Sequence, residues 1–318
     1  MIRETTPHLL TIKDAHLFTD TPEGFRSGFV SFVGRPNTGK STLTNALVGH
    51  KIAITANQPE TTRHPIRGIV HRDDAQVIVV DTPGLHRPRT LLGERLNEQV
   101  KETYADVDVI ALIIPADEKI GPGDRWILDA VRKVAPKTTL IGVVTKIDKV
   151  GRDQVMVQLQ ALHDLLGGDC EVVPCSAVKQ EQLDVLVDVI VDKLPEGPKF
   201  YPDTHLTDDD METRMAELIR EAALTGLKDE LPHSVAVEID EVLDQPTEKD
   251  PGKQAIHAII YVERPGQKGI LQKRMGRIIT DARRSLIELT GHNVFLDLRI
   301  KVLKNWQSDP KALGRLGF

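Results

Sequence analysis

A chain of 318 residues with 40% hydrophobic and 28% charged residues has the composition of a soluble protein with two domains, each large enough for its own core. Two cysteines exclude a disulfide framework, and no apolar run reaches membrane-spanning length, so we expect a reduced, cytoplasmic protein. The net charge of −6 is uneven, because residues 251–318 carry 13 Lys and Arg against 5 Asp and Glu, and this points to a C-terminal part that meets a polyanion.

The first part of the chain has the alternating pattern of an α/β domain. Residues 1–25 lack clear periodicity and contain Thr-Pro pairs, which predicts a loosely ordered N-terminal extension. From 26 to 195, strand-like apolar runs alternate with longer helical stretches, and this predicts a mostly parallel sheet with helices on both faces. The predicted strands are Phe29–Val33, Gln76–Val80, Val109–Ile114, Thr139–Thr145 and Glu171–Cys175.

A glycine-rich loop follows the first predicted strand. The stretch from Gly34 to Ser41 fits G-x-x-x-x-G-K-[ST], and apolar residues at helical spacing follow it, which is the context of a phosphate-binding loop. Its glycines let backbone N–H groups turn inward around an anion, Lys40 would reach the β- and γ-phosphates, and Ser41 would bind Mg²⁺. We expect nucleotide contacts from Gly34, Arg35, Pro36, Asn37, Thr38, Gly39, Lys40, Ser41 and Thr42.

Two further segments are predicted to complete the phosphate site. The stretch Asp81, Thr82, Pro83 and Gly84 follows an apolar strand, where Asp81 can hold Mg²⁺ and the Gly84 N–H can approach the γ-phosphate. Between this stretch and the glycine loop, a threonine could close over Mg²⁺ in the triphosphate state and let go after hydrolysis. We favour Thr62 for that ligand, with Thr61 as the alternative, so the predicted metal ligands are Ser41, Thr62 and Asp81.

A fourth segment predicts which base the bound nucleotide carries. Thr145, Lys146, Ile147 and Asp148 match [NT]-K-x-D, and the Asp148 carboxylate can accept hydrogen bonds from guanine N1–H and its exocyclic amine. Adenine lacks both donors and would leave the carboxylate unpaired, so such a site selects guanine strongly. The Lys146 stem can lie along the base face. Ser176 and Ala177, which follow the strand ending at Cys175, lie where a backbone N–H would contact the guanine carbonyl.

The rest of the chain predicts a smaller α+β domain. A Leu-Pro-Glu-Gly-Pro stretch begins a linker, assigned to 196–206, and the second domain then covers 207–318. The predicted order is helix, two strands, helix and strand, at Met211–Lys228, Ser234–Val242, Ala255–Glu263, Arg277–Leu289 and Val294–Val302. A basic cluster is expected to contact RNA phosphates through Lys268, Lys273, Arg274, Arg277, Arg283 and Arg284. The alternative for this cluster is a solvated basic helix face.

The motifs in this order resemble the translation-factor-type GTPases, and three regions narrow the match to the Era family of bacterial ribosome-assembly GTPases. Those regions are the 34–42 loop with the Thr61-Thr62-Arg63-His64 stretch, the Asp81-Thr-Pro-Gly-Leu-His stretch, and the 262–268 segment with the 305–317 tail. The resemblance covers residues 26–318 and implies a P-loop GTPase domain followed by a type II KH domain, with GTP or GDP and Mg²⁺ as ligands.

The resemblance also implies partners. These are the 3′ end of 16S rRNA and the small (30S) ribosomal subunit, whose assembly the protein would assist, together with peripheral association with the cytoplasmic face of the cell membrane. We expect a monomer. A KH domain clamps about four nucleotides through a GXXG loop, but the segment from Lys268 to Arg277, where that loop is expected, contains no GXXG.

One sequence position that matters for hydrolysis differs from the common GTPase pattern. Many GTPases carry a glutamine just after Asp-x-x-Gly to orient the attacking water, and here that position is Leu85, with His86 as the nearest polar residue. Hydrolysis should therefore be slow without added help. Asn37 resembles the asparagine that ligates K⁺ in related GTPases, and K⁺ there would stabilise charge on the phosphates. The predicted catalytic residues are Lys40, Thr62 and Asn37.

Two other functions remain open from the sequence. A P-loop kinase that uses ATP would share the glycine loop, although the Thr-Lys-Ile-Asp stretch disfavours it. An RNA-binding module that is only stabilised by its nucleotide, without significant turnover, would share both domains. Competition between GTP and ATP, and turnover of the bound nucleotide, distinguish these alternatives from a GTPase.

Overall fold

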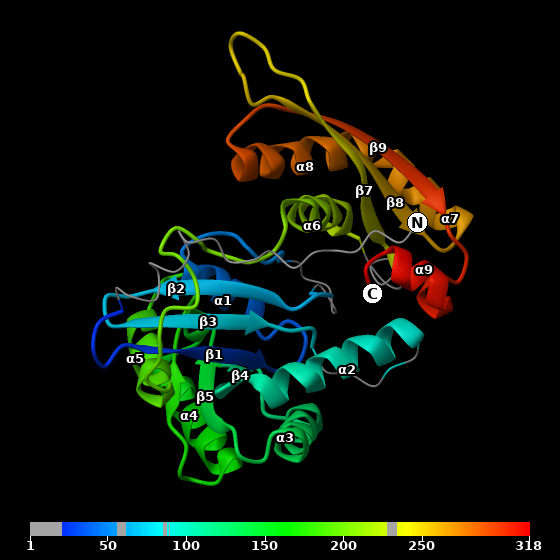
Figure 1. Cartoon of the computed structure of the whole chain (residues 1–318). Coiled ribbons are helices and arrows are strands. Elements are labelled where there is room, and N and C mark those ends of the chain that lie inside the picture. Colours follow the sequence, from blue (N-terminus) through cyan, green and yellow to red (C-terminus); the bar gives the residue numbers. More distant parts are fainter. Residues whose placement is uncertain (1–20, 56–61, 85–87, 89, 228–233) are drawn as a thin grey trace.

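The structure is a computed structural model, and it describes residues 21–55, 62–84, 88, 90–227 and 234–318. The larger of its two domains is a sheet with helices around it, and the glycine loop belongs to this domain. A smaller sheet, packed on its own helices, lies beside the larger domain (Figure 1). The predicted N-terminal extension falls almost wholly outside the described residues. Thr61, Leu85 and His86 also lie outside them.

The larger sheet has six strands in the order β2-β3-β1-β4-β5-β6, and every pair except β2 with β3 is parallel. The strands are β1 Arg26–Val33, β2 Ile66–His71, β3 Ala75–Asp81, β4 Val109–Pro115, β5 Thr139–Thr145 and β6 Val172–Pro174. This confirms the mostly parallel sheet. The carboxyl ends of β1, β3 and β5 lie at one edge, where the predicted nucleotide motifs begin.

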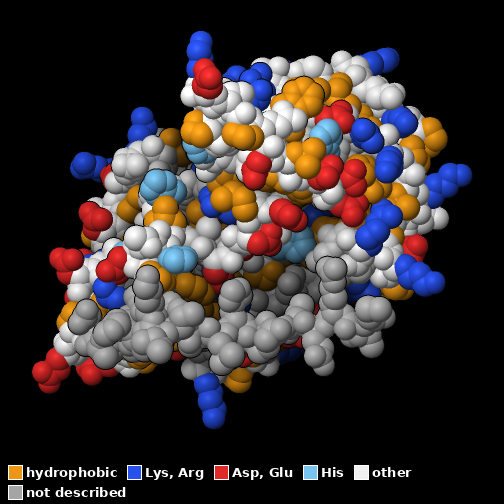
Figure 2. Space-filling model, turned by 45° about the horizontal axis from the view of Figure 1, so that its top comes forward, with side chains coloured by type: hydrophobic (Ala, Val, Ile, Leu, Met, Phe, Trp, Pro, Cys, Tyr) orange, Lys and Arg blue, Asp and Glu red, His pale blue; other side chains and the backbone are white. Residues whose placement is uncertain are grey.

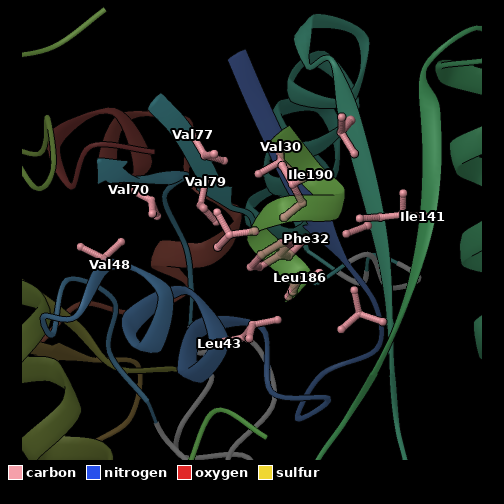
Figure 3. Close-up of a cluster of buried hydrophobic side chains, with 14 of the residues drawn as sticks. Val30, Phe32, Leu43, Val48, Val70, Val77, Val79, Ile141, Leu186 and Ile190 are labelled. Atoms are coloured by element: carbon pink, nitrogen blue, oxygen red, sulfur yellow. The ribbon is translucent and has the colours of Figure 1, made fainter. Parts of the chain in front are cut away.

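Helices cover both faces of this sheet because its strands alternate their side chains between two apolar cores. The helices α1 Lys40–Val48 and α5 Leu183–Lys193 pack against one face, where Val30, Phe32 and Ile190 meet (Figure 3). The helices α2 Leu91–Asp106, α3 Pro122–Val134 and α4 Arg152–Leu166 cover the other face. Two layers of helices thus fix the sheet that carries the loops.

The smaller sheet has three strands, β7 Ala236–Asp244, β8 Gln254–Val262 and β9 Val294–Val302. β7 and β8 are antiparallel, and β8 and β9 are parallel. Its helices are α6 Met211–Leu224, α7 Pro265–Lys273 and α8 Met275–Thr290, with a 3₁₀ turn η4 Trp306–Ser308 and α9 Pro310–Arg315 at the end of the chain. α6 lies between the larger domain and α8 (Figure 1).

The unpredicted strand and α-helices are β2, α7 and the short α9. The edge strand β2 carries Arg67 and Gly68 among its apolar residues, so it lacks the continuous apolar run of the buried strands. Helix α7 contains Gly266 and Gly269, which weaken a helical pattern. Its start is nevertheless fixed, because the Gln267 side chain accepts hydrogen bonds from the backbone N–H groups of residues 263 and 264, both at 2.9 Å. The predicted helix–strand order of the second domain therefore lacked two helices, α7 and α9.

The predicted linker, 196–206, is held along the edge of the larger sheet. The Ile69 N–H in β2 donates to the Leu206 carbonyl at 2.9 Å. The buried Gln76 side chain accepts from the backbone N–H of Phe200 at 2.7 Å and donates to the Tyr201 carbonyl at 2.8 Å. The Ile69 bond covers an otherwise open edge of β2, and the Gln76 bonds hold residues 200–201 beside the neighbouring strand β3.

Helix α2 of the larger domain shares an apolar cluster with the second domain. Leu92 and Leu96 of α2 pack with Ile259, Tyr261 and the fully buried Trp306. Across the described ranges, no helix is long and apolar enough to cross a membrane. Cys175 is buried, whereas Cys170 is only partly covered.

Candidate nucleotide-binding site

The glycine loop lies between the end of β1 and the start of α1. Gly39 caps the helix in the left-handed region, with φ of 100°, where a side chain would be strained. A Cβ on Gly34 would lie 2.6 Å from the Ile113 carbonyl oxygen of β4, so only glycine fits there. The Thr145 hydroxyl donates to the Thr38 carbonyl at 2.6 Å and ties the loop to the end of β5. The loop backbone is therefore preformed.

Lys40 is buried under this loop. Its ammonium donates to the Gly34 and Arg35 carbonyls at 3.0 and 2.9 Å. Burial lowers its pKa to about 8, and the nearby Asp81 carboxylate opposes part of that shift. A buried ammonium group at a helix N-terminus favours a bound anion, because the low dielectric strengthens their attraction. A nucleotide phosphate would supply that negative charge.

The three predicted metal ligands meet in one place. Asp81 Oδ2 accepts from the Ser41 hydroxyl at 2.6 Å and from the Thr62 hydroxyl at 3.2 Å, and the two hydroxyl oxygens are 3.1 Å apart. Burial raises the pKa of Asp81, and the bonds from Ser41, the charge of Lys40 and the bond from Thr62 lower it. Within the described residues, the buried Asp81 Oδ1 has no hydrogen-bond partner. Two hydroxyls and a carboxylate are the hard oxygen ligands that Mg²⁺ prefers, so the cluster fits that ion.

The residues predicted to recognise the base lie at the other end of the site. Lys146 adopts the left-handed region with φ of 57°, and its ammonium donates to the Asn37 carbonyl at 2.7 Å. The Ser176 hydroxyl donates to Asp148 Oδ1 at 2.5 Å and accepts from the Lys179 N–H at 3.1 Å. These bonds fix the orientation of the Asp148 carboxylate before a base arrives, and they give Ser176 a role through its side chain as well as its backbone.

A cavity of about 620 Å³ joins these parts, within the usual size of small-molecule sites. The predicted residues that line it are Pro36, Asn37, Gly39, Lys40, Ser41, Thr42, Thr62, Thr82, Gly84, Thr145, Lys146, Asp148 and Ala177. Gly34, Arg35, Thr38, Asp81, Pro83 and Ser176 are not part of the lining. The unpredicted lining residues are Ile54, Thr55, Lys149, Val178, Thr225 and Gly226. Nothing in the sequence signals the last two, which come from the second domain.

Arg35 differs from its neighbours in the loop. Its side chain forms ion pairs with Asp124 of α3 at 2.7 Å and with Glu118 at 2.9 Å. Desolvation lowers the pKa of Arg35, but the hydrogen bond and charge of Asp124 outweigh it and leave the pKa raised. Because Asp124 is fully buried and also accepts from the Gly121 N–H, Arg35 anchors the loop to α3 with its side chain directed away from the cavity.

The residues after Thr62 contact the second domain. The Arg63 guanidinium is buried, donates to the Val235 carbonyl at 2.7 Å and lies 5.6 Å from the centre of the Trp306 ring. The His64 ring stacks on Phe318 with centroids 4.7 Å apart, and burial lowers the pKa of His64. A predicted metal ligand is thus followed directly by two residues that bind the second domain.

The predicted basic cluster is spread over α7, α8 and their junction. Arg277 and Arg284 lie 3.5 and 3.9 Å from Asp281 in α8, and the Arg283 guanidinium donates to the Val294 carbonyl at 2.7 Å. On the face shown in Figure 2, acidic and basic side chains are mixed across the surface. The cluster therefore does not form one unbroken positive surface.

The α7–α8 junction lacks the expected phosphate-clamping loop. α7 ends at Lys273 and α8 begins at Met275, so the single residue Arg274 separates the two helices. The letters G-x-x-G occur at Gly266 to Gly269, but that stretch lies inside α7 and joins no two helices. A backbone clamp between the helices is therefore absent from this part of the described chain.

The phosphate loop, the oxygen cluster and the guanine-type motif at one edge of a doubly wound sheet define a P-loop GTPase domain, here followed by a KH-type α+β domain. Two family models agree with this class: the 50S ribosome-binding GTPase family matches residues 29–146, and the KH domain family matches residues 230–307.

Relatives of known name cover nearly the whole chain. GTPase Era of Corynebacterium diphtheriae is 76% identical and that of Corynebacterium glutamicum 72%, each match covering 95% of this chain and 99% of the relative. A crystal structure of Era with MgGDPNP and nucleotides 1506–1542 of 16S ribosomal RNA superposes with a TM-score of 0.86 at 34% identity, covering 92% of this chain and 99% of the other. A structure of Aquifex aeolicus Era bound to GDP and AlF4⁻ matches equally well.

The chain belongs to the Era family of GTPases, and its reaction is the hydrolysis of GTP to GDP and phosphate. This confirms the family resemblance seen in the sequence.

Proposed function

We propose that the protein is a GTP-driven switch that binds the 3′ end of 16S rRNA and assists assembly of the small ribosomal subunit. The observation that carries this proposal is the adjacency of Thr62, in the oxygen cluster with Ser41 and Asp81, and Arg63, which bonds the Val235 carbonyl of the second domain. The RNA partner is supported by the relative whose structure contains nucleotides 1506–1542 of 16S rRNA.

We assign the residue roles as follows. The backbone of the 34–42 loop cradles the phosphates, and Lys40 holds the charge of the β- and γ-phosphates. Ser41, Thr62 and Asp81 are the Mg²⁺ ligands, directly or through water, and the ion neutralises charge on the phosphate oxygens. Asp148, held by Ser176, accepts hydrogen bonds from guanine, and Lys146 lies along its base.

The hydrolysis step is proposed to depend on K⁺ at Asn37. Asn37 lines the cavity in the left-handed region, with φ of 65°, and its carbonyl accepts from Lys146. Since Leu85 cannot orient water as a glutamine does, extra positive charge beside the phosphates is the remaining source of stabilisation. We expect turnover in KCl to exceed turnover in NaCl at equal ionic strength, and Asn37→Ala to abolish that difference. Equal rates in the two salts would contradict the K⁺ role.

The second domain is proposed to hold RNA through side-chain cations. The candidates are Lys268, Lys273, Arg274, Arg277, Arg283 and Arg284, and binding should weaken steeply as salt is raised. The proposed boundaries are 26–195 for the GTPase domain, 196–206 for the linker and 207–318 for the RNA-binding domain. We further propose that the protein acts as a monomer in the cytoplasm, with peripheral contact to the cell membrane.

The decisive experiment measures nucleotide competition and turnover together. GTP and GDP should displace a fluorescent guanine nucleotide, ATP should not, and the bound GTP should be converted to GDP faster when a 16S rRNA 3′-end fragment is added. Displacement by ATP would favour the kinase, and retention of GTP without turnover would favour the nucleotide-stabilised RNA-binding module.

A further inference from the structure

The wall of the nucleotide cavity includes a turn from the second domain. Thr225 and Gly226, which follow the last residue of α6, both line the cavity. We call these two residues the 225–226 turn. Gly226 has φ of 70°, and the Thr225 N–H closes the helix by donating to the Glu221 carbonyl at 3.0 Å. The second domain therefore supplies part of the site, although all four nucleotide motifs belong to the first.

The helix end that carries this turn is attached to the first domain. Glu221 of α6 accepts from the Thr55 backbone N–H at 2.9 Å and forms an ion pair with Lys51. Thr55 itself lines the cavity. These bonds fix the last turn of α6 beside the cavity. They hold the helix and not the 225–226 turn that follows it, so the position of the turn depends on a further contact.

Arg274 holds that other side. Its guanidinium donates to the Thr225 carbonyl, and a Cβ added to Gly226 would lie 3.1 Å from its Nη2 atom. Arg274 is the single residue between α7 and α8. Among the predicted RNA-binding cations, it is the one whose hydrogen bond ends on the nucleotide cavity, since Arg283 bonds β9 and Arg277 lies beside Asp281.

We propose that Arg274 is a positioning residue of the nucleotide site, which holds the 225–226 turn in the cavity wall, and that a phosphate of bound RNA competes for the same guanidinium. The second half rests on the proposed RNA-binding function. An anionic phosphate makes a stronger, bidentate partner for a guanidinium than one neutral carbonyl does. RNA binding would then free the turn and loosen bound GDP, and by linkage GDP would weaken RNA binding by the same factor.

The first test needs no RNA. The dissociation rate of fluorescent GDP is measured for the wild type, Arg274→Ala, Arg274→Lys and the matched control Arg299→Ala, with melting curves to check folding. Arg299 is an exposed arginine of the second domain that lies 3.4 Å from Asp297. We expect Arg274→Ala to release GDP about tenfold faster, the factor that one charged hydrogen bond corresponds to. Arg274→Lys, which keeps a charged donor, should recover part of the loss, and Arg299→Ala should match the wild type. Equal rates for Arg274→Ala and Arg299→Ala would overturn the positioning role.

The second test adds a synthetic RNA with the 3′-terminal sequence of 16S rRNA. Saturating RNA should speed GDP release from the wild type and from Arg299→Ala, and it should have no further effect on Arg274→Ala. An RNA effect that persists in Arg274→Ala would overturn the competition. RNA that fails to bind the wild type would contradict the proposed function and the competition with it, while the result of the first test would stand by itself.

Discussion

Replacing Arg63 with methionine should weaken the contact between the two domains. The substitution removes a buried charged hydrogen bond of 2.7 Å to the Val235 carbonyl and a cation–π contact with Trp306, and it retains most of the apolar stem. A charged hydrogen bond contributes about 1.5–3 kcal/mol and a desolvated cation–π contact about 2 kcal/mol. Avoiding the burial of a cation offsets part of this loss. We therefore expect a net loss of about 2–4 kcal/mol in the free energy of unfolding.

The assay is urea unfolding followed by the fluorescence of Trp306. The chain has two tryptophans, so a Trp126→Phe background leaves Trp306 as the single reporter. Arg67→Met is the matched control, because Arg67 is 50% exposed and its ion pair with Asp208 at 2.8 Å lies at the surface. Such pairs contribute about 0–1 kcal/mol. If Arg63→Met and Arg67→Met shifted the free energy equally, the buried contact would not hold the domains together.

Two other predictions concern single side chains. Ser176→Ala should weaken GTP affinity about fivefold to tenfold, because Asp148 loses the hydrogen bond that orients it; unchanged affinity in a nucleotide titration would contradict that role. Burial raises the pKa of Asp209 to about 7, so the folded protein holds a proton that the unfolded chain releases near pH 4, and stability should fall as pH rises from about 4 to 7. Asp209→Asn should remove this loss and raise the free energy of unfolding at pH 8 by about 1–2 kcal/mol, with little change at pH 4. A wild-type melting temperature that stays flat across this range, or an equal gain at both pH values, would refute the assignment.

The parts of the fold that the sequence predicts are those with short-range signals. The phosphate loop, the aspartate at the end of β3 and the guanine-type motif each have a fixed spacing, and the order of parallel strands brings their ends to one edge. The edge strand β2 was missed because Arg67 and Gly68 interrupt its apolar run. Helix α7 was missed because its start depends on hydrogen bonds to the Gln267 side chain, and these contacts are seen only in the folded structure.

The site residues that could not be predicted depend on contacts between the domains. Arg63 lies in a polar stretch that predicts a surface loop, yet it is buried at 2% exposure because Val235 and Trp306 come from elsewhere in the chain. Thr225 and Gly226 line the cavity only because α6 packs beside it. No local pattern of residue types encodes such a placement, since it follows from how two separate cores meet.

We expect GTP to control how strongly the protein holds the 3′ end of 16S rRNA. The direct measurement is a pull-down from cell extract with the protein bound to a non-hydrolysable GTP analogue or to GDP, followed by sequencing of the captured RNA. We expect the 3′ end of 16S rRNA to be enriched, and enriched more strongly with the GTP analogue than with GDP. Equal capture in the two nucleotide states, or no enrichment of 16S rRNA in either, would contradict a GTP-driven switch that acts on the small ribosomal subunit.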